Sequence, residues 1–184
     1  QVFLLGVAGG LHTHGGNVDN RSMLVHPSHK TVGHQEFERW IASIRTRWQE
    51  VLSLADDDPD RVELVDEFRE AFDDLRGTVS DIPDFSIVLS ELPSAIRKTN
   101  IKEVNARQGT TPRVDWKADC SHILVGGQAM DRGFTVEGLT VTYMPRGTGT
   151  GNVDTILQRA RFFGYKGSYL GYCRIYLENR VLDA

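Results

Sequence analysis

The sequence predicts an α/β domain with a largely parallel sheet. Short apolar runs typical of buried strands alternate with stretches whose apolar residues recur every three to four positions, as on one face of a helix. Strands that alternate with helices favour parallel pairing through right-handed crossovers. The chain has 184 residues, 40% of them hydrophobic and 25% charged, which suffices for one well-buried core. No apolar run approaches the ~20 residues that span a membrane.

The predicted strands lie near residues 22–26, 101–105, 122–126, 139–144 and 172–177. The predicted helices lie at residues 37–52, 59–76, 85–96 and 152–163. Pro59 suits the first turn of the second helix, and Gly77 ends that helix. Pro93 lies inside the third helix, so we expect a kink there or two short helices.

The domain division follows from the start of the chain. Residues 1–20 are predicted to be the end of a preceding helix and a linker, because they begin with small and apolar residues and the chain opens on Gln1 rather than on methionine. We therefore expect a piece of a longer protein. Residues 21–184 form one predicted lobe with an acidic helical insertion near residues 50–91.

Charge is distributed unevenly along the chain. Residues 50–91 carry 14 of the 25 acidic side chains but only three of the 21 Lys and Arg residues. The remainder is basic and favours contact with phosphates, whereas the acidic block is expected to face away from nucleic acid or to be a solvated helix surface. Two cysteines are too few for a disulfide framework and favour a reducing, cytoplasmic location.

A glycine-rich segment, residues 126–139, follows one predicted strand and leads into the next. Glycines let backbone N–H groups approach a phosphate closely, and polar side chains lie among them. The candidate nucleotide-binding residues of this segment are Asp131, Arg132, Gly133 and Thr135. The alternative is a structural connection in which Asp131 and Arg132 pair with each other.

The predicted helix at residues 152–163 presents Gln158 and Arg161 on one face, apart from its apolar face. Arginine supplies fixed charge and a planar fork, and glutamine a neutral hydrogen bond, so the pair suits a γ-phosphate. A third segment follows the first predicted strand and offers side chains for a nucleic-acid backbone, namely Ser28, His29 and Lys30. The alternative for the helix is a solvated polar face, and the alternative for residues 28–30 is a plain turn.

Taken together, the three segments resemble motifs IV, V and VI of the second RecA-like lobe of superfamily II helicases. They are a strand with a trailing His-Pro-Ser, a Gly-Gly…Arg-Gly-Phe-Thr loop and a Gln-Arg-Ala-Arg helix. Residues 123–143 and 154–165 are most similar to the Z-one domain of endonuclease candidates, a helicase-like family of bacterial DNA-processing and defence proteins. The resemblance covers about residues 20–178 and implies a three-layer RecA-like fold, related to P-loop NTPases, in the role of a helicase C-terminal lobe.

The resemblance also implies roles at matching positions. Arg161 corresponds to the arginine finger of motif VI, and Gln158 to its glutamine. Thr135 stands where many helicases have an aspartate near the ribose, and residues 164–166 offer no second arginine. The strand-end residues implied to touch a nucleic-acid backbone, DNA more than RNA, are Asn105, Gly127 and Gln128.

The chain has no Gly-x-x-x-x-Gly-Lys-Ser/Thr phosphate loop and no Asp-Glu pair after an apolar strand. We therefore expect ATP and Mg²⁺ to be bound mainly by an N-terminal ATPase lobe of the same protein, and this chain alone to be inactive. Three alternatives stay open. A metal nuclease would use Asp84 and Glu91 or the His12-x-His14 pair. A dinucleotide-binding enzyme would use the glycines of residues 147–151. An inactive scaffold would use none of these residues.

Overall fold

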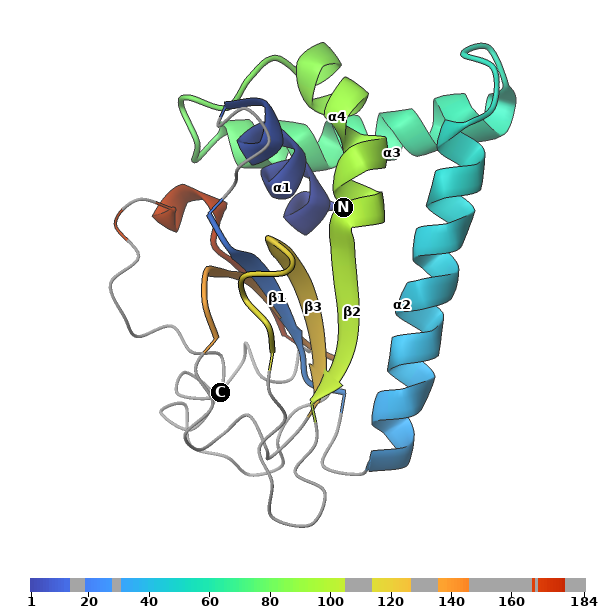
Figure 1. The fold of residues 1–184 in the computed structure, drawn as a ribbon. Helices are drawn as coiled ribbons and strands as arrows, with labels where there is room; N and C mark the ends of the chain where they lie inside the picture. The colour runs from blue at the N-terminus through green and yellow to red at the C-terminus, as the bar shows by residue number, and fades with distance from the viewer. Residues whose placement is uncertain are drawn as a thin grey trace.

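The predicted sheet is present, and its strands are all parallel (Figure 1). The computed structural model describes residues 1–13, 19–27, 31–104, 114–126, 136–145, 167 and 169–177. Within them, five strands form one sheet in the order β2-β3-β1-β4-β5. Their bounds are Arg21–Val25 (β1), Thr99–Val104 (β2), Ser121–Gly126 (β3), Leu139–Met144 (β4) and Arg174–Leu177 (β5). The α/β class is confirmed, and each strand lies within two residues of its predicted bounds.

The helices of the described residues are α1 (Val2–Thr13), α2 (Thr31–Leu52), α3 (Pro59–Arg76) and α4 (Phe85–Lys98), with a 3₁₀ turn η2 at Leu170–Tyr172. α3 begins as predicted. Asp58 accepts a hydrogen bond from the backbone N–H of Asp60, and Pro59 occupies the first turn, where its missing N–H costs nothing. The helix predicted at residues 152–163 lies outside the described residues.

Pro93 does not divide α4, so of the two expected outcomes, a kink or two short helices, the second is wrong. Val88 and Leu92 before the proline, and Ile96 after it, are all fully buried. Proline inside a helix costs about 3 kcal/mol, and burying a side chain of this kind returns about 1.5–3 kcal/mol. Packing on both sides of the proline therefore keeps one continuous helix.

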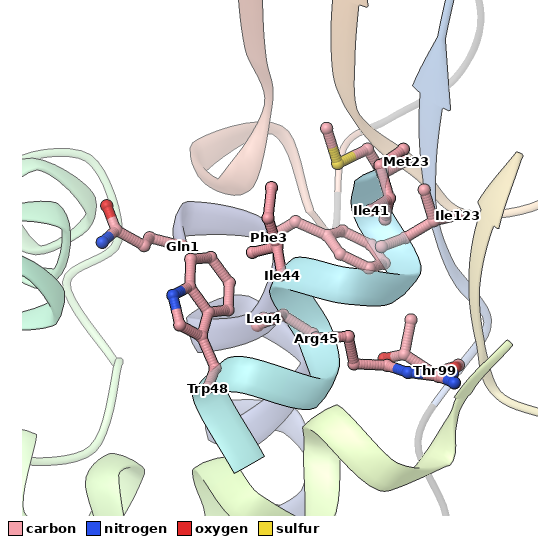
Figure 2. A pocket seen from close by; sticks show the side chains of 10 residues that line it. All are labelled: Gln1, Phe3, Leu4, Met23, Ile41, Ile44, Arg45, Trp48, Thr99 and Ile123. Carbon is pink, nitrogen blue, oxygen red and sulfur yellow. The ribbon is translucent and has the colours of Figure 1, made fainter. Parts of the chain in front are cut away.

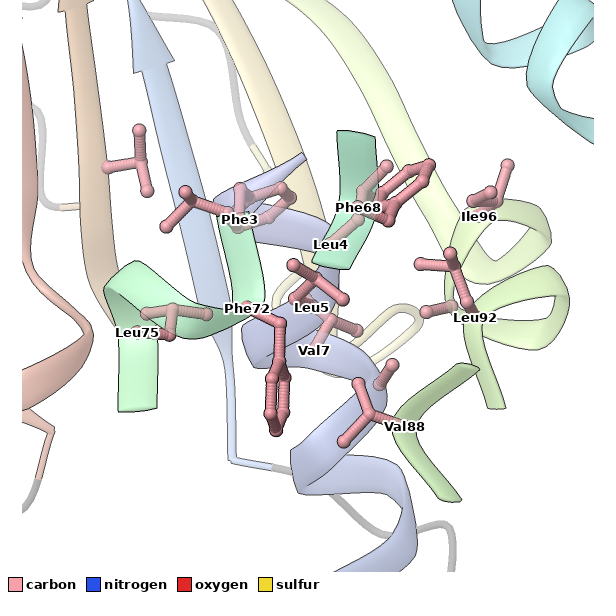
Figure 3. Close-up of a cluster of buried hydrophobic side chains, with 14 of the residues drawn as sticks. Phe3, Leu4, Leu5, Val7, Phe68, Phe72, Leu75, Val88, Leu92 and Ile96 are labelled. Atoms are coloured by element: carbon pink, nitrogen blue, oxygen red, sulfur yellow. The ribbon is translucent and has the colours of Figure 1, made fainter. Parts of the chain in front are cut away.

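α1 is buried on every side. Nine of its 12 residues are buried, and the helix packs against α3, α4 and β1. Figure 3 shows it between side chains of the two neighbouring helices, among them Phe68, Phe72, Leu92 and Ile96. A helix that is apolar all round is stable only inside a protein, so α1 forms the centre of the core. The domain boundary at residue 20 stays a prediction.

Both faces of the sheet are apolar, as is usual for parallel sheets. Alternate strand residues contact the helices and define the helical face, which includes Met23, Val25, Ile123, Val125 and Val141. The residues between them define the second face, which includes Leu24, Val104 and Leu124 and packs with Val114, Trp116 and Val136. Leu139 belongs to the second face as well, because the pairing of β1 with β4 shifts register between Ser22 and Met23. α1 and α2 pack on the helical face, and α3 and α4 pack on α1.

The acidic block, residues 50–91, forms the end of α2, all of α3 and the start of α4. Most of its carboxylates are exposed. Asp74 is exposed too, and its carboxylate accepts a hydrogen bond from Nε of Arg174 in β5 at 2.7 Å. The same guanidinium donates to the backbone carbonyl of Asp74 and to the hydroxyl of Thr78. The block therefore attaches the last strand to the helices.

A tight turn precedes β4. Gly138 has a φ of +59° and lies against Asn20, just before β1. The backbone N–H of Ser22 donates to the carbonyl of Gly138 at 2.8 Å, and the hydroxyl of Ser22 donates to the carbonyl of Glu137 at 2.7 Å. A Cβ at Gly138 would stand 1.6 Å from the carbonyl oxygen of Asn20. Only glycine fits this position.

Replacing Gly138 with alanine is expected to lower the free energy of unfolding by at least about 2 kcal/mol, because the left-handed backbone alone costs about 1–2 kcal/mol and the clash adds to it. Urea unfolding followed by circular dichroism measures the change. Gly77→Ala is the control, because Gly77 is exposed with a φ of −63°. We expect it to change the free energy by less than about 1 kcal/mol; equal losses would contradict the role of the turn.

Candidate nucleotide and nucleic-acid edge of the sheet

Four neighbouring strands end at the same edge of the sheet. Val104 pairs with Gly126, and Val25 pairs with Tyr143, so the strands finish in register. The ends of β2, β3, β1 and β4 therefore lie side by side, at Val104, Gly126, Val25 and Met144. We call this row the carboxyl edge. Ligands of parallel α/β sheets bind outside this edge.

The strand-end candidates begin directly at the carboxyl edge. Residues 28–30 follow β1 after two described residues, Asn105 follows β2, and Gly127 follows β3. The candidate residues themselves lie outside the described residues, namely Ser28, His29, Lys30, Asn105, Gly127, Gln128, Asp131, Arg132, Gly133, Thr135, Gln158 and Arg161. The structure thus places the strands that lead into them, and their individual roles stay predictions.

The end of β1 is attached to β4. The backbone N–H of His26 donates to the carbonyl of Tyr143 at 2.9 Å, and Pro27 is buried. After β1 the chain crosses to β2, on one side of β1 in the sheet. After β4 it crosses to β5, in the opposite direction along the sheet. β1 and β4 are therefore the topological switch point of the sheet, where the connections diverge and leave room for a ligand.

The glycine-rich segment runs from the carboxyl end of β3 to the amino end of β4. It leaves β3 at Gly126 on the carboxyl edge and is described again from Val136, at the start of β4. There the side-chain amide of Asn20 donates to the carboxylate of Glu137 at 2.5 Å. This hydrogen bond and those of Ser22 fix the downstream end of the segment that contains the candidates at residues 131–135.

One buried titratable side chain was not predicted from the sequence. His122 of β3 is 1% exposed on the second face, and its ring packs edge-on against Trp116 with 4.9 Å between the centroids. Its Nδ1 has no hydrogen-bond partner in the part of the chain that the structure describes. The sequence signal was weak, because Trp116 precedes His122 by six residues and follows no helical or strand period.

Burial lowers the pKa of His122 below the ordinary histidine value of about 6.5, and the nearby carboxylate of Asp119 offsets only part of this effect. The imidazole is therefore neutral at physiological pH, which suits its contact with Trp116. His122 stands near the amino end of β3, whereas the candidates follow the carboxyl end. Its position supports a structural role.

The residues weighed for metal and dinucleotide chemistry do not form a described site. Asp84 stands just before α4, and Glu91 lies within that helix. His14 and residues 147–151 lie outside the described residues. Across the described ranges, no three His, Cys, Asp or Glu side chains gather closely enough to hold a metal ion. No described helix is both long and apolar enough to cross a membrane.

The free energy of unfolding is expected to fall as the pH drops below about 6.5. The unfolded chain takes up a proton at His122 near this pH, whereas the folded chain resists protonation because its pKa is lowered. His122→Phe keeps the ring contact with Trp116 and is expected to flatten the pH dependence between about pH 7.5 and 5.5. Urea unfolding at several pH values measures both slopes, and identical slopes would contradict the assignment.

The family of the chain is established by its match to a family model. The model of the Z1 domain matches residues 1–184, which include α1 and the acidic helices as well as the glycine-rich segment. No curated protein and no solved structure matches the chain. The chain belongs to the Z1 domain family.

Proposed function

We propose that the chain is the C-terminal lobe of a superfamily II helicase-like ATPase that depends on nucleic acid, in a bacterial DNA-processing or defence protein. The carboxyl edge is the observation that carries the proposal. β2, β3 and β1 end side by side, and each leads into residues that resemble nucleic-acid-contacting motifs. Adjacent strands lie ~4.8 Å apart, so the three segments begin within roughly 10 Å. One strand of nucleic acid can lie across all of them.

Contacts at the carboxyl edge would be made mainly to the nucleic-acid backbone. Ser28, Lys30 and Asn105 carry donors for phosphate oxygens, and glycine at position 127 lets a backbone N–H come close. Such contacts fix position without reading sequence, and they weaken steeply with salt because counterions are released. α3, which carries seven of the 14 acidic side chains of the acidic block, lies at the opposite end of the sheet (Figure 1). Its negative charge therefore does not face the bound strand.

The nucleotide would lie between this lobe and an N-terminal ATPase lobe of the same protein, which would hold ATP and Mg²⁺. Gln158 and Arg161 belong to the connection that leaves β4 at the switch point. In this role Arg161 places its charge against the phosphate being transferred, and Gln158 donates a hydrogen bond. Mg²⁺ held by the N-terminal lobe would supply positive charge beside the phosphates. The remaining contacts to the nucleotide would come from Asp131, Arg132, Gly133 and Thr135.

Arg161→Ala in the full-length protein is expected to lower kcat for nucleic-acid-stimulated ATP hydrolysis by about 10³–10⁵-fold with little change in KM, because an arginine finger stabilises charge that develops in the transition state. Fold and nucleic-acid binding are expected to persist. Steady-state ATPase assays and anisotropy of a labelled single-stranded oligonucleotide measure these effects. Arg159→Ala is the matched control. If it is equally damaging, or if Arg161→Ala unfolds the protein, the arginine-finger assignment is wrong.

The 184-residue chain alone is expected to bind ATP no more tightly than a Kd of roughly 1 mM, about −4 kcal/mol, because the sequence has no phosphate loop. Isothermal titration calorimetry with Mg²⁺ and ATP measures the affinity. Micromolar binding by this chain would show that the lobe assignment is wrong.

A further inference from the structure

An open apolar groove lies on the helical face, between α2 and the strands β1, β4 and β5. It is a pocket of about 560 Å³ that continues into a second one of about 160 Å³ towards β2, and the two share five lining residues. Trp40, Ile44 and Tyr176 line the larger pocket and are 56%, 47% and 42% exposed. Met23 and Tyr143 belong to the strand side. We call this feature the α2 groove.

The sheet face in the α2 groove needs a cover, because parallel sheets are normally buried on both faces. The described helices that touch the sheet pack mainly on β1, β2 and β3. Trp116 before β3 and Val136 before β4 both pack on the second face. Among the described helices, none packs extensively on β4 or β5 on the helical face, so the α2 groove has room for an added element.

The inner end of the groove carries a guanidinium without a described counter-ion. Arg45 lines the smaller pocket beside Phe3, Ile44 and Trp48 and reaches towards Thr99 (Figure 2). Its Nη1 donates to the carbonyl of Thr99 at 3.0 Å, while its buried Nε has no hydrogen-bond partner among the described residues. Within the described ranges, no carboxylate pairs with Arg45. An acidic group that enters the groove would pair with the positive charge of Arg45.

We propose that the α2 groove is the docking site for an amphipathic helix of a partner protein, which fills the groove with apolar side chains and presents an aspartate or glutamate to Arg45. Helices are the elements that cover faces of parallel sheets, and an amphipathic helix enters a groove with side chains three and four positions apart. Tryptophan, tyrosine and arginine most often dominate interface energies. Trp40, Tyr176 and Arg45 supply them here. This inference does not depend on the proposed ATPase role.

The probe is a stapled helical peptide of about 15 residues, with leucines three and four positions apart and one glutamate on the same face. Anisotropy of the labelled peptide, titrated with the 184-residue chain, is expected to show saturable binding. Ile44→Ser is expected to weaken it at least tenfold, about 1.4 kcal/mol. Arg45→Gln is expected to weaken binding of the glutamate peptide about tenfold. It is expected to leave the affinity for a peptide with glutamine in place of the glutamate unchanged. This difference isolates the charge pair from the shape of the groove.

Val62→Ser is the matched control, because Val62 is an apolar side chain on α3 outside the groove, 44% exposed against 47% for Ile44. Trp40→Ala is a second groove variant at an exposed position, and circular dichroism checks each fold. Lack of saturation at millimolar concentration, or an equal loss in Val62→Ser, would overturn the proposal. So would equal effects of Arg45→Gln on the two peptides. A dimer in light scattering that Ile44→Ser dissociates would show that a second copy covers the groove instead.

Discussion

The complete burial of α1 is the constraint on which the helical layer depends. An apolar helix of 12 residues is not stable in water, so α3 and α4 pack along it and β1 lies against it. α1 also lies close to η2, since a Cβ at Gly6 of α1 would stand 3.1 Å from the ring of Tyr172. Arg174, two residues beyond Tyr172, then joins β5 to α3 through Asp74. The last strand and the acidic helix are thereby fixed to the core that α1 forms.

The candidate site follows from the register of the sheet more than from any single motif. The turn at Gly138 anchors the start of β4 to the residues around Ser22, and the pairing of β1 with β3 and β4 then sets where each strand ends. Three segments that are far apart in the chain consequently begin from neighbouring strands. Motif resemblance alone names residues such as Asn105 and Lys30, whereas the sheet gives a reason for them to act on the same ligand.

Local patterns were sufficient to predict the strands and most helices, because each is a periodic or continuous apolar run that has to be buried. The errors and omissions arise where distant contacts decide. Core packing outweighs the local effect of Pro93, and the pairing of Asp74 with Arg174 spans 100 residues. The contact of His122 with Trp116 depends on how a connection crosses the sheet. The mutual geometry of the twelve candidate residues depends on such connections too, so the sequence names these residues without arranging them in space.

The α2 groove and the carboxyl edge share two strands. Val25 and Tyr143 line the groove, and each stands at or next to the end of its strand. The hydrogen bond from His26 to Tyr143 then links the exit of β1 to β4 at the switch point. Because protein interiors are close-packed and transmit small displacements, a helix seated on Tyr143 would constrain the point from which residues 28–30 begin. A partner in the groove would therefore act on β1 and β4, two of the strands that lead into candidate residues.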